Sequence, residues 1–136
     1  MFGDWGAFRD PSVPRCYAIA APHAAAAGRA PFASIGTWPD RGVRGQVHVR
    51  LSRSTAAGAV ISLTVGSQRF ELTGAGADAW AQDRRMDAAI VAAMRSASTM
   101  SVSARDAAGK RFTDRYSLAG AATAMDAATV GCARSR

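Results

Sequence analysis

The chain has 136 residues, of which 49% are hydrophobic and 20% are charged, and this balance is typical of a globular domain rather than a disordered tail or a fibre. A chain of this size buries roughly two thirds of the surface of its unfolded form, so we expect residues 1–136 to fold as one domain without a metal. Lys and Arg number 17 against 10 Asp and Glu, which gives a formal net charge of +7. This charge would attract anionic partners. The arginines are nevertheless scattered along the chain, unlike the clustered stripe of a nucleic-acid-binding surface.

Alternating apolar and polar residues predict β-strands in the first third of the chain. Short strands are predicted at residues 2–8, 15–21 and 32–38, and the Pro39-Asp40-Arg41-Gly42 segment that follows has turn chemistry. The clearest alternation lies at residues 46–53, where apolar side chains face one way and polar side chains the other. That pattern is typical of a half-buried antiparallel strand.

Two hairpins are predicted farther along the chain. Residues 59–65 and 69–73 alternate on either side of Gly66-Ser67, where the glycine supplies the positive φ of a type II′ turn. Residues 100–104 and 112–118 form the second hairpin, with its turn at residues 106–110. Asp114 falls on the apolar face of the last strand, so we expect either a bulge that re-aims it or an arginine that pairs with it.

Two helices complete the predicted elements. Asp83 can cap a helix in which apolar residues recur at spacings of three and four as far as Ala97. After Gly120 a second apolar stripe at helical spacing ends at Cys132. The predicted fold is therefore β-rich α+β: an antiparallel sandwich of about seven or eight short strands with one or two helices packed on it.

The two cysteines, Cys16 and Cys132, lie near opposite ends of the chain and allow only one intramolecular pairing. They lack the C-x-x-C spacing of redox sites, and no histidine lies near them in the sequence to suggest zinc. We predict a structural disulfide between them. The alternative is a cytosolic domain with two buried, reduced thiols.

Residues that could carry catalysis are few and scattered. His23 and His48 are the only histidines, and no G-x-S-x-G turn is present. The segment Gly74-Ala75-Gly76 lacks the third glycine of a dinucleotide-binding loop. Asp83 and Asp87 share a helix face, but two arginines beside them favour a solvated helix start over a catalytic pair. We therefore expect no catalytic residues, no cofactor and no metal site.

The three tryptophans, Trp5, Trp38 and Trp80, are the largest side chains of a protein with few aromatic residues. If they were exposed, they would mark a binding patch. Trp38 lies at the end of a predicted strand, just before Pro39, and Trp5 follows Gly3-Asp4 near the start of the chain; rings at such places often cover the open end of a sandwich. We therefore expect all three to lie in the core.

Short segments near the two ends of the chain carry a resemblance to a known family. They are Gly3-Asp4-Trp5 and Arg15-Cys16-Tyr17 at the start, and Leu118-Ala119-Gly120 with Ala124 and Cys132 at the end. Together with the strand at residues 47–52, they resemble the invasion-associated locus B (IalB) family of exported proteobacterial proteins. The resemblance implies an immunoglobulin-like β-sandwich, located in the periplasm or at the cell surface, without a known catalytic site.

The resemblance also implies the function. We expect a non-enzymatic periplasmic or secreted module, with its signal peptide removed, that binds another envelope protein or an anionic surface component. No segment approaches the ~20 consecutive apolar residues of a membrane-spanning helix, so we expect no membrane span. Two alternatives stay open. A nucleic-acid-binding domain would show strongly salt-dependent affinity, and a small hydrolase would show a deep pocket with convergent polar groups.

Overall fold

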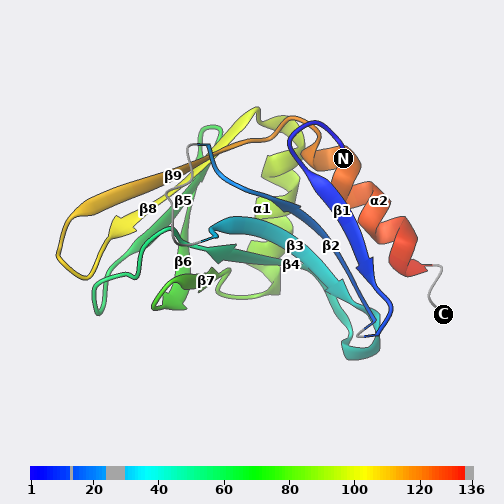
Figure 1. Ribbon diagram of the computed structural model, residues 1–136, viewed down its shortest axis with the longest axis horizontal. Helices are drawn as coiled ribbons and strands as arrows, with labels where there is room; N and C mark the ends of the chain where they lie inside the picture. Colours follow the sequence, from blue (N-terminus) through cyan, green and yellow to red (C-terminus); the bar gives the residue numbers. More distant parts are fainter. Residues whose placement is uncertain (13, 24–29, 134–136) are drawn as a thin grey trace.

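The computed structural model describes residues 1–12, 14–23 and 30–133, and in them nine strands and two helices (Figure 1). The strands are β1 (Gly6–Asp10), β2 (Arg15–Ala20), β3 (Phe32–Trp38), β4 (Val43–Arg50), β5 (Ile61–Val65), β6 (Gln68–Ala75), β7 (Asp78–Trp80), β8 (Thr99–Arg105) and β9 (Arg111–Ser117). The helices are α1 (Arg84–Ser96) and α2 (Ala121–Ala133), and a 3₁₀ turn, η1 (Pro39–Arg41), joins β3 to β4. The predicted β-rich class with two helices is confirmed.

All strand pairs are antiparallel, and the strand order is β1-β2-β3-β4-β7-β6-β5-β8-β9. The sheet has two halves, one made of β1, β2, β3, β4 and β7 and the other of β5, β8 and β9. Strand β6 joins them, because its residues 68–72 pair with β5 and its residues 73–75 pair with β7. The strands of the two halves run in different directions in Figure 1. Such pairing alone does not define an immunoglobulin-like arrangement of two separate sheets, which remains a prediction.

The predicted strands differ from the structure in two places: one strand was not predicted, and the start of another was wrong. Strand β7, which the sequence pattern does not predict, lies between β4 and β6 with Trp80 directly opposite His48. A strand of three residues is too short to show alternation. The first strand begins at Gly6 rather than at residue 2, since Phe2 and Trp5 form only an isolated bridge before it.

The core lies between the inward face of the sheet and the helices. Helix α1 packs on β4, β5 and β6, and helix α2 packs on β1, β2 and β3. As predicted, Val47, Val49 and Leu51 point inward and are buried. The predicted cap of α1 is also confirmed, because the carboxylate of Asp83 accepts the N–H of Met86 over 2.8 Å. The largest fully buried side chains include Trp5, Tyr116, Leu51, Leu63, Ile90 and Met94.

Asp114 is buried on the inward face of β9. The prediction that a bulge re-aims it or that an arginine pairs with it was wrong. The register of β8 and β9 is regular through the Val102–Asp114 pair, so there is no bulge. The partner is not an arginine: the carboxylate accepts the N–H of Ser52 over 2.9 Å and the Ser52 hydroxyl over 2.5 Å. Two hydrogen bonds to a charged acceptor offset the cost of its burial. Asp114 thus ties β9 to the segment that follows β4.

Segments from the first part of the chain contact the end of β9. The indole Nε1 of Trp5 donates a hydrogen bond of 2.9 Å to the main-chain oxygen of Ser117. The main-chain N–H of His23 donates to the main-chain oxygen of Arg115 over 2.8 Å. Strands at opposite ends of the sheet order are therefore linked by the segments next to them.

Helix α2 is anchored at both ends. Just before it, Gly120 has a φ of +85°, and a Cβ there would collide with the main-chain oxygen of Phe2. Near its end, Cys132 forms a disulfide with Cys16 of β2, with the two Cα atoms 5.7 Å apart. Both cysteines are buried. The pairing predicted from the sequence is thus present, and it holds the helix against β2.

Candidate ligand-binding site

The outward face of β2, β3, β4 and β7 carries a hollow of about 330 Å³. Its volume lies at the lower end of the range for small-molecule sites. We call it the aromatic hollow. The side chains that define it are Arg15, Tyr17, Phe32, Trp38, His48 and Trp80.

The register of the strands brings these side chains together. Ser34 of β3 lies opposite His48 of β4, and His48 lies opposite Trp80 of β7. The β3–β4 register shifts between Gly36 and Trp38, and the Trp38 ring lies over Gly36. A Cβ at Gly36 would lie 2.9 Å from a ring carbon of Trp38, so only glycine leaves room for this ring position.

The rings contact one another in geometries that stabilise aromatic clusters. His48 and Trp80 are stacked, with centroids 5.0 Å apart and planes 7° apart. Phe32 meets His48 edge to face at 5.3 Å. On the neighbouring strand β1, Phe8 stacks on Tyr17 at 5.6 Å. These separations lie in the favourable range for aromatic pairs, so the walls of the hollow are held in place before any ligand arrives.

Arg15 is the cation of the hollow. Its guanidinium carbon lies 4.3 Å from the ring centroid of Tyr17 and 5.5 Å from that of Trp38. Both are cation–π distances. Its Nε is buried and has no hydrogen-bond partner among the described residues, and none of their ion pairs includes Arg15. The guanidinium therefore has unused donors beside aromatic surface, the arrangement that suits a carboxylate or phosphate.

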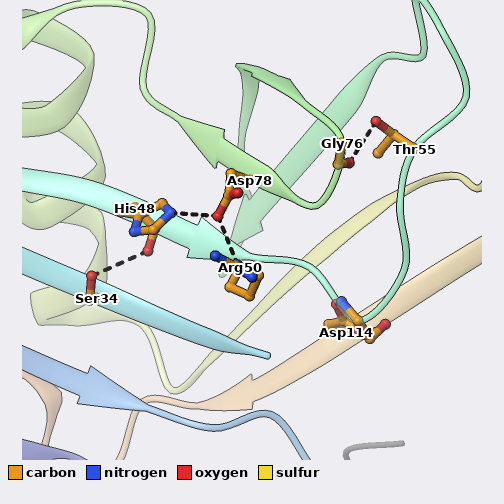
Figure 2. Close-up of polar contacts among 8 residues, drawn as sticks. Ser34, His48, Arg50, Thr55, Gly76, Asp78 and Asp114 are labelled. Carbon is orange, nitrogen blue, oxygen red and sulfur yellow. Dashed lines mark hydrogen bonds and ion pairs between the residues drawn. The ribbon is translucent and has the colours of Figure 1, made fainter. Parts of the chain in front are cut away.

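A chain of polar contacts fixes the imidazole of His48 (Figure 2). Asp78 Oδ1 lies 2.9 Å from His48 Nε2 and accepts a hydrogen bond of 2.8 Å from Arg50 Nε. Burial raises the pKa of Asp78, but the hydrogen bonds from His48 and Arg50 outweigh burial and hold it below its ordinary value. The Ser34 hydroxyl donates to the main-chain oxygen of His48 over 3.5 Å rather than to the ring. This arrangement orients the imidazole against the Trp80 ring.

Two of the three tryptophans lie in a different environment from the one predicted. Trp5 is fully buried, as expected. The prediction was wrong for Trp38, which is half-buried, and for Trp80, which is 36% exposed, because both line the aromatic hollow. His48 belongs to the same hollow, whereas His23 is exposed and lies three residues after the end of β2.

The two aspartates of α1 serve the fold. Asp83 caps the helix, and Asp87 accepts the N–H of Val47 of β4 over 2.9 Å. Burial raises the pKa of Asp87, and the hydrogen bond from Val47 only partly offsets it. Within residues 1–12, 14–23 and 30–133, no group of three or more His, Cys, Asp or Glu side chains could hold a metal ion.

Sequence reasoning missed Arg15, Tyr17 and Phe32 as site residues. A signal was present at Tyr17 and His48, because each occupies the outward phase of an alternating strand, where an aromatic ring is not needed for the core. Only the register shows that these outward positions are neighbours.

The fold and the site define a class: a small, disulfide-linked, antiparallel β-domain with two helices and an aromatic hollow on its outward face. Residues 9–129 match the family model described as Invasion associated locus B (IalB) protein, so the chain belongs to the IalB family. This family is not a known enzyme family.

Among solved structures, the crystal structure of invasion associated protein B from Bartonella henselae is similar to this chain. The TM-score is 0.66 with 16% sequence identity, over 96% of this chain and 94% of that chain. At this identity the likeness shows a shared fold. No curated protein matches the sequence significantly. None of the helices in the described part of the chain is long and apolar enough to cross a membrane.

Proposed function

We propose that the protein is a non-enzymatic binding module of the IalB type, acting as one domain in the periplasm or after secretion, and that it binds its ligand in the aromatic hollow. The observation that carries the proposal is the Arg15 guanidinium, which lies over Tyr17 and Trp38 with a buried Nε that lacks an acceptor among the described residues. A buried donor without a partner costs stability. A ligand that supplies an acceptor in the hollow would recover this cost.

The chemistry of the hollow favours an acidic saccharide of the cell envelope. The faces of Tyr17, Trp38 and Trp80 offer flat apolar surface on which the C–H face of a sugar ring can lie. Ser34 and Gln46 also line the hollow and can bond to hydroxyl groups. Arg15 would bind the carboxylate. The ligand therefore combines a ring, hydroxyl groups and one negative charge.

Export and the lack of enzymatic activity have separate support. The Cys16–Cys132 disulfide is of a kind that persists in oxidising compartments and is rare in the cytosol. His48, the one histidine in the hollow, has its Nε2 engaged with Asp78 and its ring stacked on Trp80. These contacts suit a rigid wall better than a mobile proton carrier.

Tryptophan fluorescence tests the binding site directly, because Trp38 and Trp80 line the hollow while Trp5 is buried. The wild-type protein is titrated with a galacturonic acid oligosaccharide, a neutral oligosaccharide of equal length and a single-stranded DNA oligonucleotide, each at two salt concentrations. We expect the acidic saccharide to change the fluorescence saturably and more strongly than the neutral one. Tighter binding of DNA with a steep salt dependence would instead favour the nucleic-acid-binding alternative.

Variants locate the binding. Arg15→Gln should weaken binding of the acidic saccharide about tenfold, the value of one charge-assisted hydrogen bond, and Trp80→Ala should weaken both saccharides. Val130→Ala, on the exposed side of α2, is the matched control and should bind normally. Normal binding by Arg15→Gln and Trp80→Ala would refute the site. Fractionation of cells expressing the full-length gene, with titration of thiols in unreduced protein, tests export.

A further inference from the structure

A second hollow, separate from the aromatic hollow, lies on β5, β6, β8 and β9. Its volume is about 200 Å³, and its lining includes three guanidinium groups and two hydroxyl groups. We call it the arginine pocket. The residues that define it are Arg69, Arg105, Arg111, Ser62 and Ser103.

Two of these arginines oppose each other directly. Arg105 of β8 and Arg111 of β9 are Cα partners in the antiparallel ladder. Like charges at directly opposed positions destabilise a strand pair. In the described part of the chain, no ion pair involves either of them or Arg69. The concentration of positive charge is therefore not compensated by a paired carboxylate.

One acidic residue of β6, Glu71, lies next to the pocket in the strand ladder. It is the Cα partner of Ser62, but it does not line the pocket. Its carboxylate forms no ion pair with a described residue. The lining of the pocket thus contains three guanidinium groups and no carboxylate, so the pocket has an excess of positive charge.

Two of the guanidinium groups are held in position without using all their donors. Arg69 Nη2 donates a hydrogen bond of 2.9 Å to the hydroxyl of Ser62, which is itself buried. Arg105 Nη1 donates to the main-chain oxygen of Gly109 over 3.0 Å. A guanidinium has several N–H donors in a fixed fork. Each of these two is therefore oriented by one bond and keeps others for a ligand.

We propose that the arginine pocket binds a phosphate group. A single carboxylate is satisfied by one guanidinium and would leave the other two charges uncompensated. A phosphate monoester carries close to two negative charges and three acceptor oxygens, which match several guanidinium groups and the hydroxyl of Ser103. The phosphate could belong to a soluble ligand or to a lipid headgroup, which share this chemistry. The proposal involves none of the residues of the aromatic hollow and stands or falls separately from it.

Arginine side-chain NMR measures the interaction residue by residue. The Nε–H signals of the whole chain are followed during titration with sodium phosphate and, separately, with sodium acetate, at constant ionic strength so that screening does not change. We expect phosphate to shift the signals of Arg69, Arg105 and Arg111 saturably, and acetate to shift them less. Arg111→Gln should weaken phosphate binding about tenfold. The control Arg41→Gln, which removes an exposed charge in η1, should bind as the wild type does.

Stability provides a second measurement that separates loss of binding from loss of folding. In phosphate-free buffer Arg111→Gln should melt at a temperature equal to or above that of the wild type, because it removes the repulsion from Arg105. Phosphate should raise the melting temperature of the wild type and of Arg41→Gln but not that of Arg111→Gln.

Vesicle flotation distinguishes the two sources of phosphate. Vesicles of phosphatidylcholine with phosphatidic acid are compared with vesicles of phosphatidylcholine alone. Flotation that needs phosphatidic acid and is lost in Arg111→Gln identifies a lipid headgroup as the source, and saturable binding of free phosphate without flotation identifies a soluble ligand. The proposal is overturned if neither probe binds, or if Arg41→Gln loses binding as much as Arg111→Gln does.

Discussion

Removal of the disulfide by the double change Cys16→Ala and Cys132→Ala should lower the free energy of unfolding by about 5 kcal/mol. The two cysteines are 116 residues apart in the sequence. In the chain-entropy model, closing a loop of this length lowers the conformational entropy of the unfolded chain by about 16 cal/mol/K, which corresponds to a free energy of about 4.8 kcal/mol at about 25 °C. This is a large share of the stability of a small protein, which is about 5–15 kcal/mol in total.

The folded state should survive this loss with a local change. The disulfide lies in a small cluster with Ala128 and Ala7, apart from the main core. The first part of α2 contributes Ala121, Ala124 and Met125 to the main core and does not depend on the disulfide. We therefore expect the last turns of α2 to lose protection from hydrogen exchange while the sheet keeps it.

Thermal unfolding measures the effect. An unfolding entropy of about 2.1 cal/mol/K per residue gives about 0.29 kcal/mol/K for this chain, so the melting temperature should fall by about 17 °C. Reduction of the wild type should reproduce the melting temperature of the double variant, and reductant should not change the variant further. A loss below about 1.5 kcal/mol would refute the reasoning, because it would mean that the unfolded chain gains little freedom when the bond is absent.

Three further outcomes are expected from single substitutions, each measured by denaturant unfolding against the wild type. Asp114→Ala should cost about 2–3 kcal/mol because the half-buried N–H and hydroxyl of Ser52 lose their acceptor, whereas an effect below about 0.5 kcal/mol would show that water replaces the carboxylate. Gly120→Ala should cost more than about 2 kcal/mol, since it combines a positive φ with a collision against Phe2, and a neutral effect would contradict this geometry. Burial raises the pKa of Asp87 above its ordinary value of 3.8, so the folded state binds the carboxyl proton of Asp87 more tightly than the unfolded chain does. The free energy of unfolding therefore falls as the pH rises through the range in which Asp87 loses this proton. Asp87→Asn should therefore gain stability relative to the wild type between about pH 3 and pH 6, and a pH-independent difference would contradict the assignment.

The parts of the fold that the sequence predicted are those with a local physical signature. Alternation marks strands with one buried face, which is why Val47 and Val49 were assigned to the core correctly. The cap at Asp83 depends on a residue only three positions away, so it could also be found. Strand β7 has no such signature, because three residues form it only through pairing with β4 and β6.

The site could not be assembled from the sequence because it depends on register. Tyr17, Trp38 and Trp80 come from three different strands, and the placement of the Trp38 ring depends on a shift in pairing beside it. Tryptophan is highly buried on average, and for this reason Trp38 and Trp80 were predicted to lie in the core. The prediction was wrong for these two residues because they line the aromatic hollow. The partner of Asp114 is Ser52, 62 residues earlier, a distance at which sequence pattern gives no information.

The outermost strands of the sheet have a consequence for how the protein behaves at high concentration. An open sheet presents main-chain groups on which a second chain could add a strand and begin a fibre. At one edge, β1 ends at Asp10 and is followed directly by Pro11, which has no N–H to offer. At the other edge, β9 carries Arg111 and Arg115, and the main-chain oxygen of Arg115 is already bonded to His23. Charge, proline and an occupied acceptor thus work against the growth of one sheet onto another, and the open architecture carries its own protection against aggregation.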